Sequence, residues 1–183
     1  MTRFEQRGQQ SDLDEAISLH RQAFELFLPP HPDRSGSLNN LATALWIQFQ
    51  QGGQQSHLDE AISLHREALE LRLPPHPNQA SSLNNLANAL LTQFQKGGQQ
   101  SDLDEAISLH RQALKLRLPP HPDQSNSLNS LAYALWTRFE QGGQQSDLDE
   151  AISLHRQALK LRLPSDPNRS NSLNNLEIGR AHV

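Results

Sequence analysis

Cysteine is absent from this chain of 183 residues, so disulfide bonds and thiolate metal sites are excluded. Long apolar runs are absent as well, and no stretch approaches the roughly 18 residues that a membrane span requires. The first ten residues lack the apolar centre of a signal peptide, so we expect an intracellular, cytoplasmic protein. An excess of basic charge is also missing. The chain has 16 basic and 20 acidic residues, a net charge of −4, which argues against nucleic-acid binding.

Hydrophobic residues are scarce too, at 35% of the chain, whereas globular proteins have roughly 45–50%. A thin, elongated array needs less core per residue, and the sequence repeats as such an array would. The block that begins at Ser11 returns at Ser56, Ser101 and Ser146, and the block that begins at Leu38 returns at Leu83, Leu128 and Leu173. Both blocks recur every 45 residues. A fixed period of this length predicts a solenoid, in which each repeat packs on its neighbours.

Each repeat has the pattern of two helices. In repeat 38–82 the first helix begins upstream, near Asp33, and carries apolar residues at helical spacing: Leu38, Leu41, Ala42 and Leu45. The second helix begins at Ser56 and ends before Pro74, and its expected buried stripe is Leu58, Ala61, Ile62, Leu64, Ala68, Leu69 and Leu71. The sequence thus predicts an all-α array with a partial repeat 1–37, full repeats 38–82, 83–127 and 128–172, and the start of another at 173–176.

Glycine and serine mark the turn between the two helices. The second glycine of the turn is present in all four copies, as Gly8, Gly53, Gly98 and Gly143, whereas Arg7 replaces the first glycine in the earliest copy. We therefore expect the second glycine to take the left-handed conformation that ends the first helix. Ser56 and Asp59 have the spacing of a capping box, so we expect the serine hydroxyl to accept a hydrogen bond from a free backbone N–H.

These spacings resemble the tetratricopeptide repeat, a helix–turn–helix of 34 residues. The large–x–x–Leu–Ala pattern of that family appears at Leu38, Leu41 and Ala42, and His31-Pro32-Asp33 before it resembles the longer repeat of kinesin light chains. The resemblance covers residues 1–176. It implies a right-handed α-solenoid of antiparallel helix pairs, with the first helices on the concave face. Similar arrays occur in large fungal proteins, some joined to NTPase or caspase-like modules that this sequence lacks.

The resemblance also places the candidate binding residues on the first helices. They are non-core amides and aromatics: Asn39, Asn40, Trp46, Asn84, Asn85, Asn88, Asn129, Tyr133 and Trp136. An amide both donates and accepts, so these asparagines can pair with the backbone of an extended peptide. In related repeats the position of Asn40 and Asn85 holds the peptide, and Trp and Tyr add apolar area with a polar tip. The alternative is that the asparagines bond to neighbouring repeats and the tryptophans fill the edge of the groove.

Other recurring polar residues do not have the pattern of a catalytic or metal site. A histidine recurs at the same position of the second helices, at residues 20, 65, 110 and 155, with no second ligand four residues on. We expect these histidines to be packed in place of an aromatic side chain. Asp12, Asp14 and their copies lie at a helix start rather than in a calcium loop. Because every copy repeats the same residues, we expect no catalytic residue, no metal and no cofactor.

The sequence as a whole predicts a protein–protein interaction module that binds an extended peptide or a partner helix on its concave face. We expect a protein or peptide partner, and no small-molecule substrate, nucleic acid or membrane. The alternative is a spacer within a larger signalling or assembly protein, since residues 97–119 and 142–164 are identical.

Residues 177–183 share nothing with the array, and Glu177 replaces the alanine of the other copies. We expect this tail to be a sequencing artefact.

Overall fold

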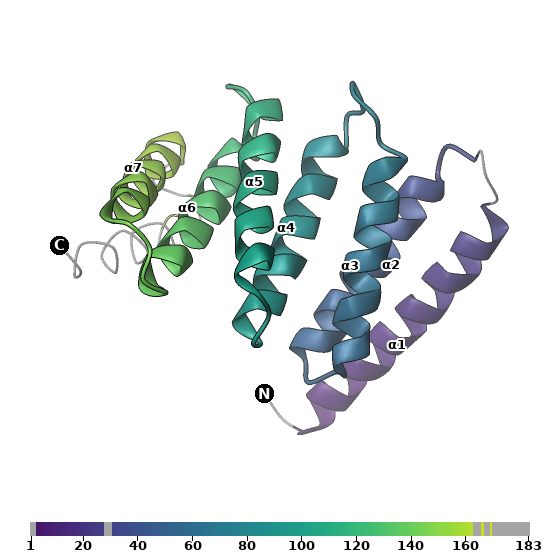
Figure 1. The fold of residues 1–183 in the computed structure, drawn as a ribbon. Helices are drawn as coiled ribbons and strands as arrows, with labels where there is room; N and C mark the ends of the chain where they lie inside the picture. The colour runs from purple at the N-terminus through teal and green to yellow at the C-terminus, as the bar shows by residue number, and fades with distance from the viewer. Residues whose placement is uncertain (1–2, 28–30, 163–165, 167–168, 170–183) are drawn as a thin grey trace. The chain divides into compact units, whose positions relative to one another are not determined.

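The computed structural model describes residues 3–27, 31–162, 166 and 169, and these contain seven α-helices and no β-strand (Figure 1). The helices are α1 (Arg3–Leu26), α2 (Arg34–Gln50), α3 (Gln55–Glu70), α4 (Gln79–Gln95), α5 (Gln100–Leu116), α6 (Gln124–Glu140) and α7 (Gln145–Leu161). Contacts divide the chain into an N-terminal unit, residues 1–89, and a C-terminal unit, residues 90–183. Helix α2 packs on α3 in the first unit, and α6 packs on α7 in the second. The predicted all-α helix pairs are confirmed.

Leucine and alanine at helical spacing form the core of each pair. Leu38, Leu41 and Leu45 of α2 are at most 2% exposed, and the same positions of α6 are at most 4% exposed. In the N-terminal unit, Leu41 and Leu45 pack with Ala61 of α3 and Ile17 of α1. Burying one leucine contributes about 2 kcal/mol, and the small alanines let the helices approach closely. Among the described helices, none combines the length and apolar character that a membrane span requires.

A pair of glycines ends each complete first helix, but their roles are the reverse of those predicted. The first glycine is left-handed, with φ of +98° at Gly52 and Gly97 and +89° at Gly142. The N–H of Gly52 donates to the carbonyl of Phe49 at 3.1 Å, and the N–H of Gly53 donates to that of Gln48 at 3.0 Å. These are the two bonds of a Schellman motif, whose left-handed residue directly follows the C-cap. The prediction of a left-handed second glycine is therefore wrong.

The second glycine is needed for space rather than for its backbone angles. A Cβ at Gly53 would lie 2.7 Å from the carbonyl oxygen of Gln48, and one at Gly98 would lie 2.8 Å from that of Gln93. Both distances are far below van der Waals contact, and the atom in the way belongs to the helix backbone. Any side chain at this position would have to push the turn away from the end of the helix.

The first repeat does not contain this turn. Arg7 stands where the other repeats have the left-handed glycine, and α1 continues unbroken over 24 residues, from Arg3 to Leu26. A non-glycine residue in the left-handed region costs about 1–2 kcal/mol, whereas arginine is among the better helix formers. The predicted turn at residues 7–10 is thus replaced by continuous helix.

The second helices are capped two residues earlier than predicted. The N-cap of α5 is Gln99, whose backbone N–H donates to the carboxylate of Asp102 at 2.9 Å. In α3 the N-cap is Gln54, and Ser56 already lies inside the first turn, so the predicted cap by Ser56 and Asp59 is wrong. The reason is that the glutamine after the glycine pair is extended, with ψ of 153° at Gln54, and helix begins directly after it.

The buried stripe of the second helix ends on an arginine rather than on a leucine. Leu71, which the sequence places in the core, is 48% exposed, whereas Arg72 is only 4% exposed. Arg72 lies four residues after Ala68 and so continues the same helix face, while Leu71 points to one side of it. Leu116 beside Arg117 and Leu161 beside Arg162 repeat the arrangement.

The loops between repeats are held by their histidines. Nδ1 of His31, His76 and His121 each accepts a hydrogen bond from the backbone N–H two residues on, at 3.1–3.2 Å. The bond fixes the chain just before the next first helix. Both the start of the repeat at 173–176 and the tail at 177–183 lie outside the described residues.

Candidate functional site

The predicted binding residues lie on α2, α4 and α6, and they differ in exposure. Asn40 and Tyr133 are exposed, Tyr133 by 40%. The remaining candidates are half-buried: Asn39, Trp46, Asn84, Asn85, Asn88, Asn129 and Trp136. Asn40 in the N-terminal unit and Tyr133 in the C-terminal unit therefore offer the most side-chain surface to a ligand.

Hydrogen bonds between side chains connect successive first helices within each unit. In the N-terminal unit, Asn85 donates from Nδ2 to Oδ1 of Asn39 at 3.2 Å. In the C-terminal unit, Gln95 donates from Nε2 to the hydroxyl of Tyr133 at 2.9 Å. These bonds support the alternative role of the asparagines in holding repeats together. They also fix the positions of the side chains that a peptide would meet.

The tryptophans and Asn129 are used largely for packing. Trp46 lies against the apolar cluster that α2 forms with α1 and α3. Trp136 packs on Leu148 and Ile152 of α7, and its ring stacks on Tyr133 with centroids 5.8 Å apart. Oδ1 of Asn129 lies 2.9 Å from Nδ1 of His155 in α7. Of the stacked aromatic pair, Tyr133 is the member that faces solvent.

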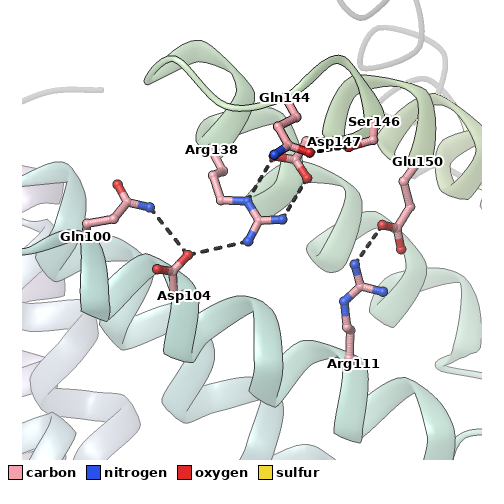
Figure 2. A network of polar contacts seen from close by, with 8 residues as sticks. All are labelled: Gln100, Asp104, Arg111, Arg138, Gln144, Ser146, Asp147 and Glu150. Carbon is pink, nitrogen blue, oxygen red and sulfur yellow. Dashed lines mark hydrogen bonds and ion pairs between the residues drawn. The ribbon is translucent and has the colours of Figure 1, made fainter.

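A charged network that sequence reasoning missed connects α5, α6 and α7 (Figure 2). At its centre, Arg138 of α6 donates to the carboxylate of Asp147 through Nε at 3.0 Å and through Nη2 at 2.7 Å. The third guanidinium nitrogen, Nη1, lies 3.4 Å from Oδ1 of Asp104 in α5. Hydrogen bonding to Asp147 raises the pKa of Arg138 above its ordinary value. A separate ion pair joins Arg111 to Glu150 at 2.7 Å.

Most of these side chains line an open polar pocket of about 570 Å³ beside the turn from α6 to α7, and Asp104 does not. Its lining includes Gln100, Arg111, Arg138, Asp147 and Glu150. Each arginine faces a carboxylate, so the charges are balanced and the network suits the joining of three helices. The sequence did contain a signal for this network, because the residue at the position of Arg138 differs between repeats. The position of Arg138 is Gln48 and Gln93 in the two preceding repeats.

A buried arginine after α3 joins two first helices, and this too was missed from sequence. Arg72 donates from Nε to the hydroxyl of Ser35 and from Nη2 to its carbonyl, both at 3.2 Å. Its Nη1 donates to the hydroxyl of Ser82 in α4. Arg117 likewise donates to Ser127 of α6, at 2.7 Å. Burial lowers the pKa of Arg72 and of Arg117, because desolvation disfavours the charged form.

Three of the four histidines that were expected to be packed are buried, whereas His20 is half-buried. His65, His110 and His155 are at most 5% exposed. Burial lowers the pKa of each to about 4, so all three are neutral at pH 7. The described side chains include no group of three or more histidine, aspartate or glutamate residues that could hold a metal ion.

The architecture is that of a tandem array of two-helix repeats, and comparison with known families identifies the repeat. Residues 35–78 and 79–123 each match the family model described as tetratricopeptide repeat. The matched segments contain α2 with α3 and α4 with α5. The chain therefore contains tetratricopeptide repeats over residues 35–123.

Solved structures share this fold at low sequence identity. BtubC (BKLC) from P. vanneervenii aligns with a TM-score of 0.73 at 22% identity, over 96% of this chain and 68% of that one. A kinesin light chain-type protein of Podospora anserina with nearly identical TPR-like repeats gives 0.69 at 22% identity, over 96% and 82%. MamA gives 0.62 at 14% identity, over 100% and 85%. Comparison with curated protein sequences gives no significant match.

Proposed function

We infer that this chain is a protein–protein interaction scaffold that binds an extended peptide along its first helices, the concave face in the family. Tetratricopeptide repeats generally serve as such scaffolds, and repeat arrays use long continuous surfaces to bind partners. The observation that supports the finer proposal is the exposure of Asn40 and Tyr133 on helices whose neighbours are fixed by side-chain hydrogen bonds.

The chemistry of these two residues suits a peptide backbone and an apolar side chain. The exposed amide of Asn40 can donate to a peptide carbonyl and accept from a peptide N–H. The ring of Tyr133 is supported from behind by Trp136, so it presents apolar area with little rotamer freedom to lose. Each unit thus offers its own contacts to a peptide.

Peptides selected from a random phage-displayed library on the whole chain test the proposal. The affinity of each selected peptide is measured by fluorescence polarisation. Asn40→Ala and Tyr133→Ala should each weaken binding by roughly 5- to 30-fold, the range of an interface hot spot. Asn40 is preferred to Asn85 for this test, because Asn85→Ala would also remove the bond to Asn39.

Matched controls are Ser63→Ala in α3 and Arg156→Ala in α7, both exposed residues of second helices. They should leave affinity unchanged. If the selected peptides bind both first-helix variants as tightly as they bind the wild type, peptide binding on this face is ruled out.

A spacer is the second candidate function, and repeated ion pairs favour it. Arg21 pairs with Glu60 at 2.8 Å and Arg111 with Glu150 at 2.7 Å, each between consecutive second helices. The same contact in successive repeats favours an array that adds a fixed length with each repeat. A spacer would keep its function with Asn40→Ala and Tyr133→Ala and lose it when residues 83–127 are deleted. For either role we propose no catalytic activity.

A further inference from the structure

Exposed leucines mark the ends of the second helices in both units. The N-terminal edge consists of Leu26, Leu71 and Leu73, which are 78%, 48% and 73% exposed. The C-terminal edge consists of Leu116, Leu118 and Leu161, which are 50%, 70% and 50% exposed. Single exposed leucines are ordinary on protein surfaces, but a group that recurs at the same helix end in repeat after repeat indicates a covered surface.

A charged residue of opposite sign precedes the helix-end leucine on the two edges. Glu25 and Glu70 stand directly before Leu26 and Leu71, whereas Lys115 and Lys160 stand directly before Leu116 and Leu161. All four charged residues are exposed. The sequence Leu-Arg-Leu-Pro follows at 71–74, 116–119 and 161–164, so the edges share one apolar pattern and differ in charge.

We propose that the N-terminal edge of one copy of this chain docks on the C-terminal edge of a second copy. The chain itself supplies two surfaces with matching leucines and opposite charges, which identifies the occupant as another copy. Glu25 and Glu70 then meet Lys115 and Lys160. Two N-terminal edges, or two C-terminal edges, would bring like charges together and repel each other.

Leucines and charges have separate parts in this contact. The leucines provide the affinity, because docking removes their apolar area from water. Exposed ion pairs add little affinity, but they decide which surfaces meet and how fast. Both closed dimers and longer assemblies satisfy the pairing, since the two surfaces that meet are different.

Sedimentation velocity of the full chain, from about 1 to about 200 μM, tests the proposal. The wild type should associate reversibly. Glu25→Lys with Glu70→Lys makes both edges basic, and Lys115→Glu with Lys160→Glu makes both acidic. Each double variant alone should associate at least roughly tenfold more weakly. An equimolar mixture of the two should associate again, and so should one chain that carries all four changes.

Leu73→Ser with Leu118→Ser should weaken association by at least roughly tenfold as well. Leu19→Ser is the matched control, because Leu19 is 56% exposed on α1 but lies two helical turns, about 10 Å, before Leu26. Circular dichroism checks that each variant remains helical. A wild type that stays monomeric over the whole range overturns the proposal. The proposal is also overturned if the charge variants and the leucine variant associate as strongly as the wild type, for example through the ends of the array.

Discussion

Single residues give each repeat its own contacts although the repeats are nearly copies. Asp102 accepts the N-cap N–H of α5, and Asp147 at the same position of α7 binds Arg138. In α3 that position is His57, whose Nδ1 is buried and has no hydrogen-bond partner among the described residues. His57 therefore gives α3 no carboxylate cap of the kind that Asp102 gives α5.

The buried histidines should make stability depend on pH. The pKa values of His65, His110 and His155 are lowered to about 4 in the folded chain, so between pH 4 and 6.5 the unfolded chain binds more protons. Stability should be complete above pH 6.5 and fall as the pH drops towards 4. Each unit of pKa depression corresponds to about 1.4 kcal/mol for each histidine. Urea unfolding at pH 7.0, 6.0 and 5.0 measures the loss.

His110→Phe is the matched variant, because it keeps an aromatic ring in the same buried position. Its free energy of unfolding should fall less steeply with decreasing pH than that of the wild type. Equal slopes for the two proteins between pH 7.0 and 5.0 would show that buried imidazole is not the cause.

Sequence reasoning at this scale worked for residues whose surroundings are local. The core leucines and alanines follow helical spacing, which is fixed within one helix, so their burial was predictable. The burial of His65 followed from the same spacing. Arg72 was missed because its burial depends on Ser35 and Ser82, 37 and 10 residues away. The pocket around Arg138 was missed for the same reason, since the residues that line it come from three helices.

At the scale of elements, the contrast between α1 and α2 shows how one glycine divides helices. Helix α2 ends where Gly52 becomes left-handed, whereas α1 continues through the equivalent Arg7. The presence of two helices per repeat was predictable from apolar spacing and proline. The roles of the two glycines were not, because a shift of one residue decides which of them is left-handed and which one meets the backbone.

Arg7→Gly should divide α1 into two helices. The variant restores the glycine pair that closes the other turns, and glycine takes the left-handed conformation without the cost that arginine has. Backbone chemical shifts of residues 7–10 should move from helical to turn values, and hydrogen exchange at these residues should speed up. Arg7→Ala is the control and should leave α1 continuous. Helical shifts through residue 10 in the glycine variant would contradict this explanation.

At the scale of the whole molecule, hydrogen bonds and ion pairs between repeats hold neighbouring repeats together. Arg72 donates hydrogen bonds to the preceding first helix, α2, and to the following first helix, α4. The ion pair of Arg21 with Glu60 links consecutive second helices. The stability of a repeat array is approximately a sum over repeats and the interfaces between neighbours. Loss of a residue that belongs to an interface should therefore reduce both stability and cooperativity.

Arg72→Met tests this coupling. Methionine replaces the apolar stem of the arginine but leaves the hydroxyls of Ser35 and Ser82 without their donor. We expect a loss of about 1–3 kcal/mol and a broader transition in guanidinium unfolding followed by circular dichroism at 222 nm. Arg156→Met, an exposed arginine of α7, is the control. A midpoint for Arg72→Met that is unchanged or raised would mean that the buried charge does not couple the repeats.

The reach of Arg72 also affects where the array can be divided. Its acceptors, Ser35 and Ser82, enclose a stretch of chain that is longer than the 45-residue period. A cut before residue 38 separates the guanidinium from Ser35, whereas Ser82 stays in repeat 38–82 with Arg72. Excising residues 38–82 alone would remove Ser35 from Arg72, so a shortened array intended to fold should begin at the start of α2.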